Sequence, residues 1–228
     1  MNELESLQNS IVRCTRCPRL VKWREQVARE KTKRFLGWEY WGKPIPGFGD
    51  PTGRLLLVGL APAAHGGNRT GRMFTGDSSG DWLFRALYKA GFANQAASTS
   101  REDGLELSDC YITATCRCAP PKNKLLPEEI RTCRPYLIKE LRLLKQVKVV
   151  IGLGKVGFDA AVQSFAEIGR STLKKKPIFQ HGAELRLGDD ITLLATYHPS
   201  QQNTFTGRLT EPMFNRIFRR AATLLTPR

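Results

Sequence analysis

Six cysteines carry the clearest chemical signal in this 228-residue sequence: Cys14, Cys17, Cys110, Cys116, Cys118 and Cys133. Cys14 and Cys17 form a C-x-x-C pair, a spacing that lets two thiolates bind one centre from a tight turn. Because Pro18 follows at once, we expect no helix to run through that turn. In a cytoplasmic chain of this length a disulfide framework is not expected, so a metal, a cluster and simple core packing compete.

The remaining cysteines favour a cluster over zinc. A zinc ribbon needs a second C-x-x-C pair, and the sequence has none. One close pair with two single cysteines suits a [4Fe-4S] cluster better. From spacing alone, either Cys116 or Cys118 can supply the third ligand, with Cys133 as the fourth. Cys110 and the unused member of that pair are interpreted as buried apolar residues.

The charge of the chain indicates its kind of partner. Lys and Arg number 36 against 21 Asp and Glu, a formal net charge of +15. Each neutralised phosphate releases counterions, so this excess favours nucleic acid, with an Arg-rich thermophile-style surface as the alternative. No apolar run approaches a membrane span, and the N-terminus has no signal-peptide pattern. We expect a cytoplasmic monomer that binds nucleic acid and no membrane.

Short apolar runs without strict alternation, and helical periodicity between them, predict the elements that position these residues. Strands are expected at four runs: 54–59, 110–116, 147–152 and 191–197. Helices are expected in four places: 81–90, 127–144, after Gly154, and 212–225. This order predicts a parallel sheet between helical layers, in a single domain over residues 1–228. In such a fold the functional residues lie in the loops after the carboxyl ends of the strands.

One of these loops carries a nucleotide-binding pattern. GLGKVG, at 152–157, is a G-x-G-x-x-G match between a strand and a helix. The acidic residue expected about twenty positions later is missing, and that region holds Lys174 to Lys176. Tight strand-to-helix packing is therefore favoured over nicotinamide binding.

The other loops together resemble the uracil-DNA glycosylase superfamily. GLAPA, GRMF, CAPPKNK with a downstream Cys133, and HPS occur in that order, and AAHGGNRTGRMFTGD is most similar to family 5, type b, of the iron-sulfur branches. The resemblance implies an α/β/α sandwich around a central four-stranded parallel sheet. It also implies hydrolysis of the N-glycosidic bond of a deaminated base flipped out of DNA.

The same resemblance implies a structural [4Fe-4S] cluster. By motif position Cys118, and not Cys116, matches the family's cysteine before two prolines, which gives the ligand set Cys14, Cys17, Cys118 and Cys133. Such a cluster would tie the N-terminal segment, residues 1–50, to the body of the domain.

Breaking the bond between the base and the sugar indicates which groups the site needs. Negative charge develops on the base and positive charge on the sugar, so a hydrogen-bond donor and an anion or positioned water are required. His198, followed by Pro199, suits the donor. Asp77 is the best available carboxylate, although it can instead cap the helix near residue 81. Asn123 can bind the base or a water, or stabilise its Pro-rich turn.

Residues around the first strand are expected to hold the base. Phe74 is expected to stack on the flipped ring, with core packing as its alternative, and Gly59 and Ala61 to line the pocket. Superfamily members often place a polar residue after this glycine and an Asn at the end of the second strand. Here those stretches read LAPA (60–63) and ITA (112–114). The likeness to family 5 implies a broader substrate range that includes hypoxanthine.

DNA contacts are expected at five further residues: His65, Arg69, Phe205, Arg208 and Leu209. The first two are interpreted as phosphate contacts or loop anchors. The last three end the loop QQNTFTGRL, where an apolar wedge beside a cation can fill the gap that a flipped base leaves, unless they pack on the body. The alternative function is an iron-sulfur or zinc nucleic-acid-binding module without catalysis.

Overall fold

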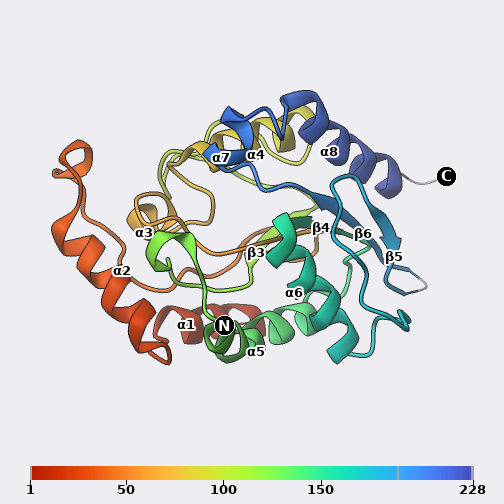
Figure 1. Ribbon diagram of the computed structural model, residues 1–228, viewed down its shortest axis with the longest axis horizontal. Coiled ribbons are helices and arrows are strands. Elements are labelled where there is room, and N and C mark those ends of the chain that lie inside the picture. The colour runs from red at the N-terminus through yellow and green to blue at the C-terminus, as the bar shows by residue number, and fades with distance from the viewer. Residues whose placement is uncertain (1, 189, 227–228) are drawn as a thin grey trace.

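A mixed six-stranded sheet forms the middle layer of the protein in the computed structural model, which describes residues 2–188 and 190–226 (Figure 1). The strand order is β1-β3-β2-β4-β6-β5. In chain order the strands are β1 (Phe48–Gly49), β2 (Leu55–Gly59), β3 (Cys110–Ala114), β4 (Val149–Leu153), β5 (Glu184–Arg186) and β6 (Thr192–Thr196).

The four central strands are parallel, and every residue in them is buried. Apolar runs without strict alternation are typical of strands covered on both faces, so all four predicted strands are confirmed. The predicted central four-stranded parallel sheet is therefore confirmed, and two antiparallel edge strands, β1 on β3 and β5 on β6, extend it to a mixed sheet of six. Both are too short, and too weakly apolar, to show a periodic signal.

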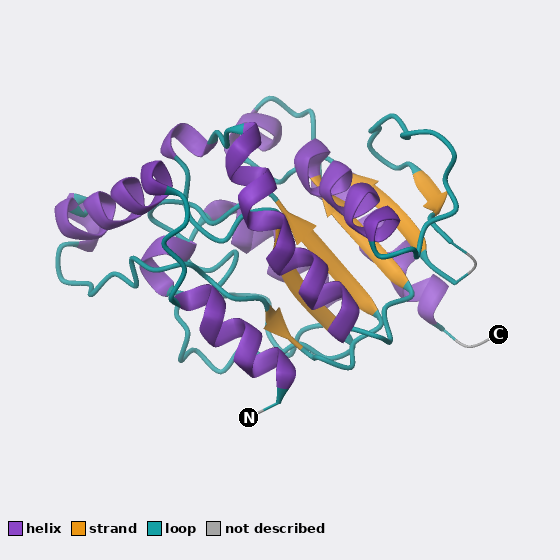
Figure 2. Cartoon of the chain, turned by 90° about the horizontal axis from the view of Figure 1, so that it is seen from below, coloured by secondary structure: helices purple, strands orange, loops and turns teal. Residues whose placement is uncertain are grey.

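Helices cover both faces of this sheet, which confirms the three-layer α/β/α class (Figure 2). One face is packed by α4 (Ser78–Lys89) and α8 (Glu211–Leu225), and the other by α5 (Pro127–Leu143) and α6 (Gly154–Glu167). Shorter helices lie at the loops: α3 (Gly67–Thr70), α7 (Gln201–Phe205) and the 3-10 turns η1 (Lys33–Phe35) and η2 (Pro121–Asn123). Within the described ranges, no helix has both the length and the apolarity to cross a membrane.

The N-terminal segment lies against the second helical layer. Helix α1 (Glu3–Val12) packs on α5 through Leu7, Ile11 and Tyr136. The chain then turns through the C-x-x-C pair, and α2 starts at Pro18 and ends at Glu30. The predicted helix break is therefore confirmed. An ion pair of 2.7 Å between Arg19 and Glu129 fastens α2 to α5.

The glycines of GLGKVG serve packing, as expected from the sequence. A Cβ at Gly152 would lie 2.6 Å from the Cα of Phe158 in α6. A Cβ at Gly157 would collide with the carbonyl oxygen of Val58 in β2. Since neither position has room for a side chain, both glycines let α6 approach the sheet closely.

Candidate functional site

The loops after β2 and β6 bring an aromatic ring and a histidine together at the carboxyl edge of the sheet. The rings of Phe74 and His198 lie 6.0 Å apart between centroids, with 30° between their planes. A Cβ at Gly59 would lie 2.8 Å from Cζ of Phe74, so this ring packs against the bare backbone at the end of β2. Phe74 also has a φ of 54°, a conformation costly for a side chain of this size. Ala61 lies on the same loop and is partly exposed.

His198 is held by its backbone, while its ring nitrogens stay available. The side-chain amide of Asn203 donates to the carbonyl oxygen of His198 at 2.8 Å. A Cβ at Gly154 would lie 3.1 Å from the Cβ of His198, so the middle glycine of GLGKVG makes room for it. Neither ring nitrogen bonds to a residue that the structure describes. Burial lowers the pKa of His198 to about 4, so the neutral ring offers one N–H donor at neutral pH.

A second histidine, which the sequence patterns did not single out, supports this strand end. His181 Nδ1 accepts a hydrogen bond from the backbone N–H of Tyr197 at 3.1 Å, and the two rings stack at 5.0 Å. The guanidinium of Arg208 lies over the ring of Tyr197, 4.5 Å from its centroid. His181 belongs to no motif. The only signal in the sequence that could have indicated it is that the chain has just three histidines.

Asp77 caps helix α4. Its Oδ1 accepts from the backbone N–H of Gly80 at 3.0 Å, and its carboxylate lies against Gly66, where a Cβ would collide with Oδ2. Burial raises the pKa of Asp77. The capping role weighed from the sequence is therefore present in the structure, and a role in hydrolysis stays a prediction.

Asn123 lies on the exposed turn η2. Among the residues that the structure describes, no hydrogen bond joins it to His198. The φ of Asn123 is 55°, and its backbone N–H donates to Pro120 at 3.2 Å. Asn tolerates this left-handed conformation better than most residues, which favours the turn-forming interpretation. Its catalytic role stays a prediction.

Arg69 anchors a loop, which is one of the two roles weighed for it from the sequence, and its burial argues against the other, a contact with DNA phosphate. The residue is 3% exposed, and its guanidinium donates to the carbonyl oxygens of His65 at 2.8 Å and Gly76 at 3.0 Å. It lies between two aromatic rings, 4.0 Å from the Phe35 centroid and 4.1 Å from that of Trp38. His65 is itself paired, since its Nδ1 lies 3.1 Å from the Tyr40 hydroxyl.

The loop after β6 contains one exposed apolar residue. Leu209 is 1% exposed and belongs to the main core, so the expectation that it contacts DNA is corrected. Phe205, at the end of α7, is 81% exposed, and the neighbouring Arg208 is also exposed. Of the two apolar residues expected to act as a wedge, only Phe205 is exposed.

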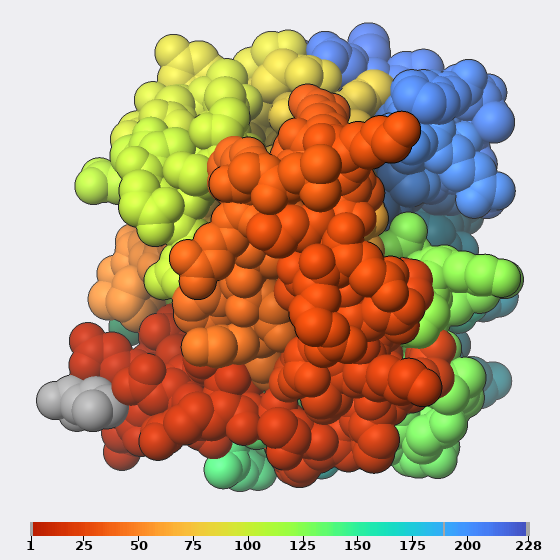
Figure 3. Space-filling model, turned by 90° about the vertical axis from the view of Figure 1, so that its left-hand side faces the viewer, coloured from red at the N-terminus to blue at the C-terminus, as the bar shows by residue number. Residues whose placement is uncertain are grey.

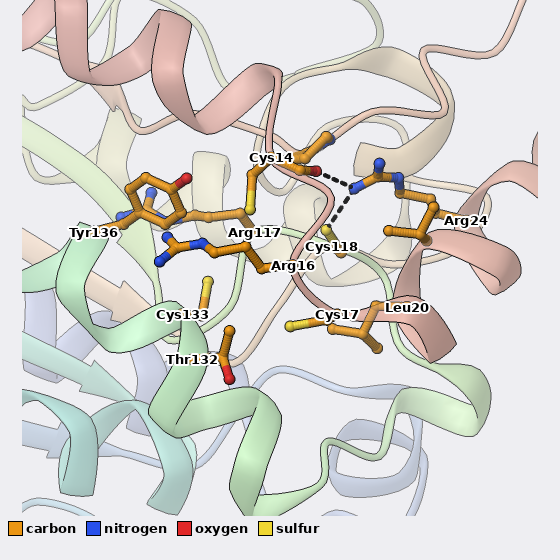
Figure 4. Close-up of a pocket in the computed structure, with 12 residues that line it drawn as sticks. Cys14, Arg16, Cys17, Leu20, Arg24, Arg117, Cys118, Thr132, Cys133 and Tyr136 are labelled. Carbon is orange, nitrogen blue, oxygen red and sulfur yellow. Dashed lines mark hydrogen bonds between the residues drawn. The ribbon is translucent and has the colours of Figure 1, made fainter.

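Four cysteines line one pocket, and they are the four that the family resemblance implies (Figure 4). Cys14 and Cys17 come from the turn between α1 and α2, Cys118 from the loop after β3 and Cys133 from α5. Among the described residues, no three His, Cys, Asp or Glu side chains form a group that could hold a single metal ion. The thiols instead lie around the walls of a shared space.

The two remaining cysteines lie outside the lining of this pocket. Cys110 is fully buried in β3. The Cys116 thiol lies 3.6 Å from the carbonyl oxygen of Glu129. Its interaction with Cys133 and its burial both raise the pKa of Cys116. The same interaction lowers the pKa of Cys133 to about 7. Cys110 and Cys116 are both buried, as the sequence predicted, and the Cys116 thiol donates to the carbonyl oxygen of Glu129.

Arginines surround the cysteine pocket. Arg24, buried in α2, donates through Nη1 to Sγ of Cys118 at 3.0 Å and to the carbonyl oxygen of Cys14 at 3.3 Å. Arg117 is also buried and pairs with Glu140 of α5. Burial raises the pKa of Cys118, and the charged donor Arg24 opposes that shift by stabilising the thiolate.

These features define an α/β enzyme fold with its site at the carboxyl edge of a parallel sheet and a separate four-cysteine pocket beside it. A sequence profile of the family described as "Uracil DNA glycosylase superfamily" matches residues 46–222. The chain belongs to the uracil-DNA glycosylase superfamily.

Similar proteins with curated names indicate which types of uracil-DNA glycosylase the chain resembles. The chain is 49% identical to a type-5 uracil-DNA glycosylase of Mycobacterium leprae, over 97% of this chain and 95% of that protein. It is 46% identical to a type-5 uracil-DNA glycosylase of Thermus thermophilus, over 96% and 97%. A type-4 uracil-DNA glycosylase of Pyrobaculum aerophilum is 28% identical, over 87% and 83%.

Proposed function

We propose that this protein is a DNA repair glycosylase that hydrolyses the N-glycosidic bond of uracil flipped out of DNA. The observation that carries the proposal is the pairing of Phe74, packed on Gly59, with the unoccupied ring nitrogens of His198. The names of the type-5 relatives support the same activity.

A gel assay for alkali-labile sites in uracil-containing DNA tests this proposal. We expect such sites to appear with the purified protein and not with uracil-free DNA of the same sequence. A nucleic-acid-binding module without catalysis, the alternative function, would bind both DNAs and produce no alkali-labile sites.

The chemistry follows from the two rings. Extrusion places the base in a pocket where an aromatic face can stack on it. Because His198 is neutral, its N–H hydrogen bonds to a base oxygen without carrying charge into the pocket, and this bond strengthens as negative charge develops on the leaving base. Phe74 orients the base, and His198 stabilises the transition state.

On the sugar side we assign Asp77 to the positioned water or to the developing positive charge. An Asp77→Asn variant separates this role from capping, because Asn caps a helix about as well as Asp. We expect its melting temperature to match the wild type, while single-turnover excision falls by less than the roughly 10² expected for losing a transition-state donor. Asp77→Ala should also lose about 1 kcal/mol of folding stability. An unchanged rate for Asp77→Asn would assign Asp77 to capping alone.

The substrate range includes hypoxanthine in this proposal. At the end of β3, Thr113 donates its hydroxyl to Glu140 at 2.6 Å, and the neighbouring Ile112 and Ala114 are apolar. The sheet therefore presents no amide there to select the edge of uracil, which agrees with a broader pocket. Competition between uracil- and hypoxanthine-containing duplexes measures the preference.

The four-cysteine pocket is proposed to hold a [4Fe-4S] cluster. Thiolates are the usual protein ligands of such clusters, and Cys14, Cys17, Cys118 and Cys133 surround a common space. When bound, the cluster would supply four covalent links between the N-terminal turn, the loop after β3 and α5. Arg24 donates to Cys118 and fixes that ligand's orientation.

Phe205 is proposed as the wedge that fills the gap left by the flipped base. A Phe205→Ala variant should lose more excision from a stable U·A duplex than from single-stranded uracil DNA, where no unstacking cost of a few kcal/mol arises. Single-turnover rates on both substrates measure this difference. Equal losses on the two would remove the wedge role from Phe205.

Leu209→Ala serves as the matched comparison for the wedge. Because Leu209 is buried in the core, its truncation should leave a cavity and destabilise the fold by about 2–5 kcal/mol. Any loss of activity from this variant should be similar on both substrates and should follow the loss of folded protein.

A further inference from the structure

A basic and apolar segment projects from the protein beside the catalytic loops. We call residues 31–43 (KTKRFLGWEYWGK) the N-terminal arm; it follows α2 and includes η1. Leu36 is 62% exposed and Trp38 is 38% exposed. In Figure 3 the arm is the orange segment that projects toward the viewer.

The charges on the arm suit a polyanion. Lys33, Arg34 and Lys43 are exposed, and within the part of the chain that the structure describes none of them forms an ion pair. Glu39 is the one acidic residue in this thirteen-residue segment. Apolar and aromatic side chains interspersed with cations are typical of surfaces that hold nucleic acid through both backbone and base contacts.

The arm lies on the same face as the loops of the candidate site. Figure 3 shows it in front, with the blue segment around α7 at the upper right and the green segment around η2 at the right. Exposed Phe205 belongs to the blue segment, and exposed Lys122 and Lys124 to the green one. The arm, α7 and η2 are therefore exposed on the same side of the molecule (Figure 3).

One buried side chain links the arm to the catalytic loop. Phe35 and Trp38 hold the guanidinium of Arg69 between their rings, and Arg69 donates to the carbonyl oxygens of His65 and Gly76. The loop that Arg69 spans carries Phe74. Displacement of the arm would thus disturb the segment that shapes the base pocket.

We propose that the N-terminal arm is a second DNA-binding surface, in which Lys33 and Arg34 neutralise phosphates and Leu36 and Trp38 pack against the sugars or bases beside the flipped nucleotide. The inference rests on the proposed function in that it takes DNA as the substrate. Through Arg69, an arm held by DNA also fixes the loop that carries Phe74.

The first test compares two double variants that remove the same charges. K33S/R34S changes the arm, and R142S/K145S removes one Arg and one Lys from the region between the last turn of α5 and the start of β4, where the parallel strands begin. Affinity is measured by fluorescence anisotropy on a uracil-free duplex with a stable abasic-site analogue, over a series of salt concentrations. We expect K33S/R34S to bind severalfold more weakly, with a salt slope smaller by roughly 2, and R142S/K145S to change little.

The second test asks whether the apolar tip touches DNA. A Trp38→Phe variant keeps an aromatic ring beside Arg69 and removes one of four tryptophans. We expect the change in tryptophan fluorescence on adding the same duplex to be clearly smaller in Trp38→Phe than in the wild type. Leu36→Ser should weaken binding without changing the melting temperature, because its side chain is exposed.

Specific outcomes would overturn the inference. Equal affinity and equal salt slope for the two double variants would remove the arm from the DNA interface. A change in sedimentation of Leu36→Ser, with DNA binding intact, would make the arm an interface between copies of the chain. Because the duplex holds no uracil, these measurements stand apart from excision: a wild-type protein that released no uracil but bound through the arm would refute the proposed function alone.

Discussion

Replacing His198 with alanine is expected to lower single-turnover excision of uracil by roughly 10² to 10³, while DNA affinity stays within a few fold. The donor acts on charge that develops only in the transition state, so its removal raises the barrier and leaves ground-state binding nearly unchanged. Rapid-quench measurement of excision, together with anisotropy on an uncleavable duplex, gives the two numbers. A parallel loss of binding and rate would make His198 a structural residue.

The pH profile provides a second check on His198. Because burial lowers the pKa of the ring to about 4, the imidazole stays neutral as the pH falls from 8 to 6. The excision rate should therefore not increase as the pH falls through the usual titration range of histidine. An increase would be expected if a charged imidazolium were the donor. A His198→Gln variant, which keeps an N–H donor, should recover part of the rate that His198→Ala loses.

Replacing Cys118 with serine is expected to abolish stable iron binding, whereas replacing Cys116 with serine leaves the iron in place. The two residues are separated by Arg117 alone, yet Cys118 lines the cysteine pocket and Cys116 directs its thiol toward Glu129 and Cys133. Purified wild-type protein should be brown, with the broad thiolate-to-iron absorption of such clusters. Iron and sulfide content per chain measures occupancy independently of activity.

Cys110→Ser is the matched control for these variants, since Cys110 is buried in β3 away from the pocket lining. It should retain iron and colour. The reverse pattern, iron lost with Cys116 and kept with Cys118, would reverse the ligand choice. A colourless protein with stoichiometric zinc would refute the cluster altogether.

The sequence predicted the central sheet well because burial on both faces leaves a plain apolar pattern. It also predicted that GLGKVG serves packing, because the acidic residue that a dinucleotide-binding site needs downstream of this motif is missing. Periodicity could not tell whether Leu209 or Phe205 faces solvent, because both lie in a short polar loop where the path of the chain decides exposure. Only the folded chain shows that α7 turns Phe205 outward.

Arg69 illustrates why the rest of the site could not be predicted. Its type and its glycine-rich surroundings suggest a phosphate contact, but its partners Phe35 and Trp38 lie far back in the chain. Spacing alone carried no information on that contact. In the same way, Cys116 and Cys118 are equivalent by spacing, and the bend after β3 is what separates their directions.

The packing of α1 on α5 also bears on how the chain acquires its structure during translation. Leu7 and Ile11 are translated before Tyr136, their partner in a helix that ends at residue 143. Helix α1 therefore cannot complete this packing until α5 has been made. Cys14 and Cys17 also depend on Cys133, so the proposed cluster could not bind all four cysteines before α5 has been made.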